Sequence, residues 1–405
     1  MRNPLLTFLL ILVCFNVKAQ DLQTYIGIAV AENPGLKAYE TRYKIAQEKV
    51  EEANWIPNTE LSTSYFMSEP ETRTGPQRAR FAARQMFPWF GTINSREKYA
   101  TVLSEAEYTD YQVERRELIL KVARSFYQLQ ALKAQDAILQ ENIDLLETYE
   151  RLAITSVEVG SASAADVLRL QIRQNELRQE SRTIQQEILA ETAGFDALLN
   201  RKGETTYNFP DSLGIPSHDP EISNEGLLLN PELVRFDKLY KSVIRAEALN
   251  RKEAAPMFGF GVDYIPVANR TDMSVPENGK DILMPMVSLS IPIFNKQFRS
   301  RTVQNEMRQT ELELQRQERL NQLQSALARA IHERNAARVT HGLLEENLHQ
   351  VRQVEDILLK NYETGTIDFN EILDIQEMHL RFQNKLTEAV RTYYEKSAII
   401  NYLTQ

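Results

Sequence analysis

The fold is decided by residues 92–159, which read TINSREKYATVLSEAEYTDYQVERRELILKVARSFYQLQALKAQDAILQENIDLLETYERLAITSVEV. These 68 consecutive residues contain no glycine or proline, the two residues that most disfavour a helix interior. The apolar residues recur at steps of three, four and seven, a pattern typical of a helix with one buried stripe. The stripe consists of Leu118, Val122, Phe126, Leu129, Leu132, Leu139, Ile143 and Leu146. A helix over most of this window would be roughly 90–100 Å long, so it requires a coiled coil or a tubular bundle.

The second half of the chain repeats the plan of the first. Further helices are predicted at about 161–199 in the first half, and over most of 293–364 and 366–405 in the second. Three motifs recur in the same order: Asn33-Pro34 with Asn230-Pro231, Phe87–Phe90 with Ile291–Phe294, and Asp166–Leu168 with Glu371–Leu373. Repeats of this kind indicate one structural unit used twice. We therefore predict a first repeat over 20–200, a linker rich in proline, serine and aspartate over 201–226, and a second repeat over 227–405.

Residues 1–19 have the pattern of a secretory signal peptide. Arg2 precedes the apolar run Leu5–Val17, and Val17-Lys18-Ala19 offers the small residues that a signal peptidase requires. An apolar helix of that length reaches roughly 20 Å, which is too short for a hydrocarbon core of about 30 Å. We predict cleavage before Gln20 and export of the mature chain.

Cys14 is the single cysteine, so the predicted mature chain has none. This excludes disulfides, thiolate metal sites and cysteine nucleophiles. Lipidation of Cys14 is the weaker alternative, because Val13 stands where a lipidation motif has a small residue. Loss of the two positive charges of Arg2 and Lys18 changes the formal net charge from −9 to −11. An acidic exported protein is a poor binder of nucleic acid, because phosphates are bound by basic surfaces.

The motifs that mark common enzymes are absent from the sequence. There is no H-E-x-x-H, G-x-S-x-G or P-loop pattern, and the five histidines form no ligand-spaced pair with carboxylates. We therefore predict that the chain is not an enzyme and uses no metal or other cofactor.

Each half also carries two short stretches with strict alternation of side chains. Met257–Ile265 places bulky apolar residues on one face and glycine or aspartate on the other, which is the period of a β-strand. The predicted strands are Thr59–Met67, Gln77–Phe87, Met257–Ile265 and Ile282–Ile291. Loops rich in turn residues separate the two strands of each predicted hairpin.

Strands of about nine residues have the length that crosses a bilayer obliquely. After the signal no apolar stretch approaches 18 residues, so a membrane form of this chain would have to be a β-barrel. Four strands cannot close a barrel, and three chains together would supply twelve. The alternative is a small soluble β-domain that caps a coiled coil.

The order of these parts resembles the TolC-type outer-membrane efflux proteins, also called outer membrane factors. The shared order is a signal peptide, Asn-Pro, a hairpin, a very long helix, a glycine tip and a returning helix, all then repeated. The tip pattern stands here as Gly160 with Asp166-Val167-Leu168, and as Gly365 with Glu371-Ile372-Leu373-Asp374. The resemblance covers essentially all of the mature chain.

The resemblance implies a homotrimer with a mainly α fold and a small β part. Its long helices would form a periplasmic α-barrel roughly 100 Å long, continuous with an outer-membrane β-barrel that the three chains share. The implied partners are a periplasmic adaptor and an inner-membrane pump of a tripartite efflux or type I secretion system, together with outer-membrane lipid.

The second tip carries carboxylates at helical spacing. Glu371 and Asp374 are three residues apart and therefore share a face, and Asp368 continues the row. In a trimer each becomes a ring of three, an arrangement that selects or holds cations and in which like charges raise one another's pKa. The resemblance implies that Glu371 and Asp374 form the channel constriction. The alternative is an ordinary solvated helix face.

Five other residues complete the candidate gate. The resemblance places the tip turns at Gly160 and Gly365, and places a hydrogen-bonding gate tyrosine at Tyr362. Asp166 and Arg169 are the first-half counterparts of Glu371 and Asp374, and Arg169 could pair with a neighbouring carboxylate to close the tip. The chain departs from some family members after the second tip glycine, where Ile367 follows Thr366 in place of a basic residue.

Two functions of different classes remain open from the sequence. A passive export duct is favoured, because the chain has two equivalent helical hairpins in tandem. A soluble periplasmic coiled-coil adaptor or scaffold is the alternative. The substrate is equally open, since drugs, metal cations and secreted polypeptides all fit a shared duct.

Overall fold

The computed structural model describes residues 22–158, 160, 163–202, 207, 209–210, 213–220, 224–364, 366–367 and 369–405. The predicted signal peptide, Cys14, Gly365 and Asp368 lie outside the described residues. The described helices are α1 Leu22–Glu32, α2 Pro34–Glu52, α3 Thr92–Glu158, α4 Ala164–Leu198, α5 Asn224–Leu228, α6 Pro231–Glu253, α7 Lys296–Glu363 and α8 Phe369–Thr404. The described strands are β1 Glu60–Tyr65, β2 Glu71–Thr72, β3 Gly75–Pro76, β4 Ala79–Phe87, β5 Met257–Ile265 and β6 Ile282–Ser290.

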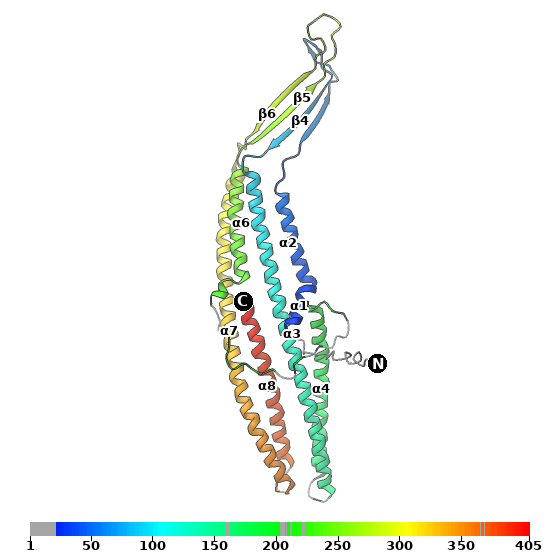
Figure 1. Ribbon diagram of the computed structural model, residues 1–405, viewed down its shortest axis with the longest axis vertical. Helices are drawn as coiled ribbons and strands as arrows, with labels where there is room; N and C mark the ends of the chain where they lie inside the picture. The colour runs from blue at the N-terminus through cyan, green and yellow to red at the C-terminus, as the bar shows by residue number, and fades with distance from the viewer. Residues whose placement is uncertain are drawn as a thin grey trace, which may run out of the picture. The chain divides into compact units, whose positions relative to one another are not determined.

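The chain divides into two compact units. Unit 1 contains the residues up to Lys37 together with Val113–Asn230 and Asn321–Gln405, and unit 2 contains Ala38–Gln112 and Pro231–Leu320. The prediction of a mainly helical chain with a small sheet and an internal duplication is confirmed. Figure 1 shows the two longest helices, α3 and α7, each followed by a returning helix, α4 or α8.

The buried stripe predicted for the long helix forms much of the core of unit 1. All eight predicted residues of that stripe are buried, and Val122, Leu129 and Leu139 are fully inaccessible. Toward the tip the stripe packs against buried residues of α4 and α8, including Leu170 and Ile372. The two helical hairpins therefore share one core at this end of unit 1.

The duplicated Asn-Pro motif has the same structural role in both halves. The Asn33 side chain accepts from the Leu36 N–H at 3.1 Å, and its amide donates to the carbonyl of Leu198, at the end of α4, at 3.0 Å. The Asn230 amide donates to the carbonyl of Leu403, near the end of α8, at 3.1 Å. The prolines that follow begin α2 and α6, where their missing N–H costs nothing. Each motif thus starts one helix and ties it to the end of the returning helix.

The described part of the predicted linker packs closely onto unit 1. Tyr207 is 3% exposed, and its ring meets those of Tyr25 and Phe195 at centroid distances of 5.5 and 4.9 Å. Farther along, Asp219 accepts hydrogen bonds from Arg338 and from the hydroxyl of Tyr393. Aromatic packing and an ion pair therefore hold this segment, although its composition is that of a surface loop.

Unit 2 contains an antiparallel sheet with the strand order β1-β4-β5-β6. The four strands lie within one or two residues of their predicted bounds, and β4 pairs with β5 over Phe81–Phe87 and Phe258–Tyr264, so the hairpins of the two halves form one sheet. A short pair, β2 and β3, lies in the first hairpin's loop. Strands β1 and β6 are the edges of the sheet, each with one unpaired side.

Candidate functional site

The first tip turn lies between α3 and α4 in unit 1. Gly160 has φ +76, a left-handed conformation that glycine adopts without steric cost, and its N–H donates to the Val157 carbonyl at 3.0 Å. A capping box then begins α4: the Ser163 hydroxyl accepts from the Ala165 N–H at 3.2 Å, and the Asp166 carboxylate accepts from the Ser163 N–H at 3.3 Å. Gly160 is thus placed where the predicted turn requires it.

Asp166 is buried at the start of α4, whereas Arg169 is exposed. Asp166 is 8% exposed, because its carboxylate is turned back onto the start of α4. Arg169 lies 3.8 Å from Asp166 and donates to the side chain of Asn370 in α8. Within the chain, Arg169 therefore links the two helical hairpins at the tip through an amide. The neighbouring carboxylate with which Arg169 pairs is that of Asp166, and closure of the tip by Arg169 stays a prediction.

Tyr362 lies in the last turn of α7, with its ring packed against the tip core. Its ring meets that of Phe369, the first residue of α8, edge to face at 5.1 Å, and Phe369 meets Tyr149 of α3 at 6.1 Å. Phe369 is 1% exposed. The Tyr362 hydroxyl is buried, and no described residue accepts its proton. The two ends of the second turn are therefore held together by aromatic contact.

The second-tip carboxylates are directed away from this core. Glu371 and Asp374 are exposed, whereas the intervening Ile372 is fully buried and Ile375 is buried. Glu371 lies in the first turn of α8, where the helix N-terminus favours a negative charge. The structure therefore places Glu371 and Asp374 together on an accessible face, as their spacing predicts.

A buried polar network lies one to two turns farther from the tip. Glu355 of α7 accepts hydrogen bonds from Tyr149 at 3.2 Å and from Gln376, and its second oxygen lies 3.1 Å from Nδ1 of His379. Burial, followed by the nearby charge of Glu355, raises the pKa of the Tyr149 hydroxyl well above its usual value. Sequence reasoning missed this network, because its members come from three helices and form no local motif.

The two faces of the sheet in unit 2 differ strongly. The apolar face carries Leu61, Phe81, Phe260, Val262, Tyr264, Leu283, Val287 and Leu289, all of them exposed. Leu61 and Val287 are 78% and 73% exposed, whereas a sheet in a soluble domain normally covers such a face. The face is therefore a large uncovered apolar surface.

The other face of the sheet is polar and closely packed. Asp263 of β5 is fully buried and forms an ion pair with Arg80 of β4. Gly261 lies opposite Arg84, and a Cβ built there would come within 2.9 Å of the β4 main chain and 3.1 Å of the Arg84 side chain. The glycines of β5 thus leave room for the long side chains of β4.

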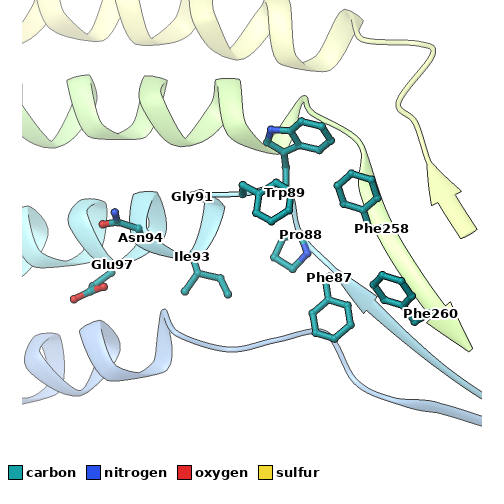
Figure 2. Close-up of a pocket in the computed structure, with 10 residues that line it drawn as sticks. Phe87, Pro88, Trp89, Gly91, Ile93, Asn94, Glu97, Phe258 and Phe260 are labelled. Atoms are coloured by element: carbon teal, nitrogen blue, oxygen red, sulfur yellow. The ribbon is translucent and has the colours of Figure 1, made fainter. Parts of the chain in front are cut away.

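An aromatic groove of about 780 Å³ lies where β4 meets α3, lined by Phe87, Trp89, Phe258 and Phe260 (Figure 2). Trp89 stacks on Phe258 at 5.1 Å, and Phe87 meets Phe260 at 6.1 Å. The groove contains the first copy of the repeated strand-end motif. The aromatic run Phe87–Phe90 is the local sequence signal for this groove.

None of the described helices is long and apolar enough to cross a bilayer. Among the described side chains, no three histidines, cysteines or carboxylates are grouped so that they could hold a metal ion.

Part of this architecture matches a known protein family. Residues 25–201, which span nearly all of α1 to α4 and the first tip turn, match the family described as outer membrane efflux protein. The match covers the first repeat and ends where the predicted linker begins. A search of curated protein sequences gave no match.

Several solved structures resemble nearly the whole chain and not only residues 25–201. CusC aligns with a TM-score of 0.78 at 15% identity, over 94% of this chain and 91% of that one. VceC, an outer membrane protein of Vibrio cholerae, gives 0.73 at 17% identity, over 95% and 96%. The MtrE outer membrane channel of Neisseria gonorrhoeae gives 0.74 at 14% identity, over 95% and 88%. At these identities the likeness shows the fold, which extends through both repeats.

Proposed function

We propose that this chain is one subunit of a homotrimeric outer-membrane channel, which serves as a passive export duct. The observation that carries the proposal is the four-stranded sheet with one uncovered apolar face. Burial of that face in lipid would remove from water the side chains that unit 2 leaves exposed. The polar face, with Arg80 and Asp263 paired on it, would line an aqueous lumen.

The edges of the sheet support a shared barrel. Strands β1 and β6 each have an unpaired side, and unpaired backbone groups are not tolerated in lipid. Pairing of β6 with β1 of the next subunit would join three sheets into a closed barrel of twelve strands. The aromatic groove lies at one end of the sheet, where outer-membrane barrels carry an aromatic girdle.

The helical hairpins support a duct that extends into the periplasm. Each of α3 and α7 is roughly 100 Å long at 1.5 Å per residue, far longer than a compact domain requires. Three copies of two such hairpins would form a tube. Its substrates would come from an inner-membrane pump through a periplasmic adaptor, as in tripartite efflux or type I secretion. The chain itself would be exported by its signal peptide, residues 1–19, which is then cleaved.

Fractionation of expressing Gram-negative cells tests the proposal directly. We expect the mature chain in the outer membrane, migrating as a trimer that survives mild SDS and dissociates on heating. Recovery as a soluble periplasmic monomer would contradict the proposal and favour an adaptor or scaffold. A charge on the apolar face, as in Val287→Asp, should abolish the trimer, whereas Ser288→Asp on the opposite face should preserve it.

We further propose that Glu371 and Asp374, continued by Asp368, form the constriction of the duct at the second tip. Their exposure leaves both described carboxylates accessible, and a trimer would place three copies of each around the axis. Rings of carboxylates hold multivalent cations. Tyr362 and Arg169 would keep the tip closed from behind the rings, because they connect α7 and α4 to α8.

Planar-bilayer conductance tests the constriction. We expect the variant with Glu371→Gln and Asp374→Asn to require at least about tenfold more La³⁺ for half-block, because each ring loses its charge. Glu377→Gln, an exposed carboxylate farther along α8, is the matched control and should be blocked like the wild type. Equal block of all three proteins would exclude these rings as the cation site. Arg169→Ala should raise basal conductance, and an unchanged closed state would count against its role.

A further inference from the structure

A cavity of about 540 Å³ lies within unit 1, between α1, α3, α7, α8 and the predicted linker. We call it the basic cavity, because its described lining includes Arg115, Arg116 and Arg334 and no aspartate or glutamate side chain. Its volume lies within the range of small-molecule sites. Neither the constriction nor the sheet uses it.

The arginines of the basic cavity are only partly satisfied by the chain. Arg334 is 5% exposed, lies 3.3 Å from Asp219, and has a buried Nε with no described partner. Asp219 is shared with Arg338, whose donors also reach main-chain carbonyls of the linker. One carboxylate thus serves two guanidinium groups. A buried donor without an acceptor is unfavourable, so this site favours an additional anion.

Arg116 adds a second incompletely satisfied cation. Its Nη2 donates to the main-chain oxygen of Gln405 at 2.7 Å, while its buried Nη1 has no described acceptor. Burial lowers the pKa of the Arg116 guanidinium, and the neighbouring charge of Arg115 lowers it further, against an opposing effect of Tyr402. Arg115 and Arg116 therefore place two positive charges on the α3 wall of the cavity.

The remaining wall of the basic cavity is apolar and aromatic. Tyr127 and Tyr394 stack with ring centroids 5.0 Å apart, and Ile26, Ile119 and Leu120 line the cavity beside them. Inorganic phosphate would leave this wall in contact with water alone. A ligand with an anionic group and an apolar body matches both parts.

We propose that the basic cavity binds an amphipathic organic anion, with its carboxylate or phosphate group toward Arg116 and its apolar body along Ile119 and Leu120 toward Tyr127 and Tyr394. Guanidinium groups suit carboxylate and phosphate because they offer planar, paired donors. The inference goes beyond the role as a duct, and its test involves no transport.

Equilibrium dialysis of the full chain, purified in detergent, tests the proposal against protein-free micelles of the same detergent. The probe is 4-phenylbutyrate, and its neutral isostere 4-phenylbutan-1-ol measures apolar partition alone. We expect saturable binding of the anion, at least about tenfold tighter than that of the alcohol and weakened by NaCl, because charge-assisted hydrogen bonds are the stronger ones. Failure of the anion to bind above the micelle background would overturn the proposal.

Variants identify the binding groups. Arg116→Gln should weaken binding of 4-phenylbutyrate at least about tenfold, and it does not disturb the Asp219 ion pairs that Arg334→Gln would break. Arg124→Gln is the matched control, because Arg124 lies on α3, pairs with Glu395 at 3.3 Å and does not line the cavity. Binding by Arg116→Gln equal to that by Arg124→Gln would refute the assignment. Displacement of the probe by equimolar inorganic phosphate would refute the apolar half of the site.

Discussion

Replacement of Phe369 by leucine should loosen the second tip turn without unfolding the rest of unit 1. Phe369 begins α8 and is 1% exposed, with edge-to-face contacts to Tyr362 at 5.1 Å and to Tyr149 at 6.1 Å. Leucine keeps most of the apolar volume and removes both ring contacts. Each contact contributes about 0.5–1.5 kcal/mol beyond area burial, so the expected loss is about 1–3 kcal/mol.

Hydrogen exchange followed by mass spectrometry measures this loss locally. Amides of residues 370–376 should exchange about 5- to 140-fold faster in Phe369→Leu, since 1.4 kcal/mol corresponds to a factor of ten. The contacts join the ends of one turn, so the effect should be concentrated there. Basal conductance should also rise, because the turn carries the proposed constriction.

Phe195→Leu is the matched control for this experiment. Phe195 is fully buried in unit 1, and its ring meets Tyr25 and Tyr207 edge to face at 5.3 and 4.9 Å. It lies roughly 45 Å along α4 from the residue that begins that helix. Its replacement should cost a similar free energy while leaving exchange at residues 370–376 unchanged. Equal exchange at the tip in both variants would refute the reasoning that these rings hold the turn.

Three further outcomes follow from single contacts. Burial raises the pKa of the Asp219 carboxyl, but hydrogen bonds from Tyr393 and Arg338 outweigh this effect and hold the pKa below its ordinary value. The contribution of this carboxylate to stability should therefore be present above pH about 4 and be lost as pH falls further. Limited proteolysis of the linker at stepped pH would measure that loss. Ser163→Ala should cost about 1 kcal/mol and speed exchange in the first turn of α4 only, and uniform acceleration along that helix would contradict the capping role. Gly261→Val should destabilise the sheet by about 1–3 kcal/mol and reduce trimer yield on native gels, because its Cβ would overlap the β4 main chain; a normal yield would show that the strands adjust.

Much of the fold could be predicted because its helices and strands are unusually regular. Every residue of the stripe from Leu118 to Leu146 is buried, since a single uninterrupted helix preserves its period over many turns. The strands were predicted for the same reason, because alternation fixes which side chains share a face. The position of β4 beside β5 was less accessible to sequence reasoning, since it pairs residues about 180 positions apart.

Features built from several segments could not be predicted. Tyr207 lies in a stretch whose composition indicates a loop, yet it is buried because Tyr25 and Phe195 provide an aromatic site for it. The network around Glu355 joins three helices. The basic cavity is formed by α1, α3, α7, α8 and the linker. A period along one helix identifies its buried face but gives no information on which polar groups another helix brings to that face.

The two tips have the same geometry but differ in the surroundings of their matched carboxylates. Asp166 and Glu371 are matched positions, and both lie in the first turn of a returning helix. Asp166 is buried because Ser163 supplies the N–H that its carboxylate accepts, whereas Glu371 is exposed. A buried, hydrogen-bonded carboxylate is unavailable to a cation in a pore. Of the two matched carboxylates, we therefore expect Glu371 and not Asp166 to face the proposed constriction, so that each proposed ring would hold three charges and not six.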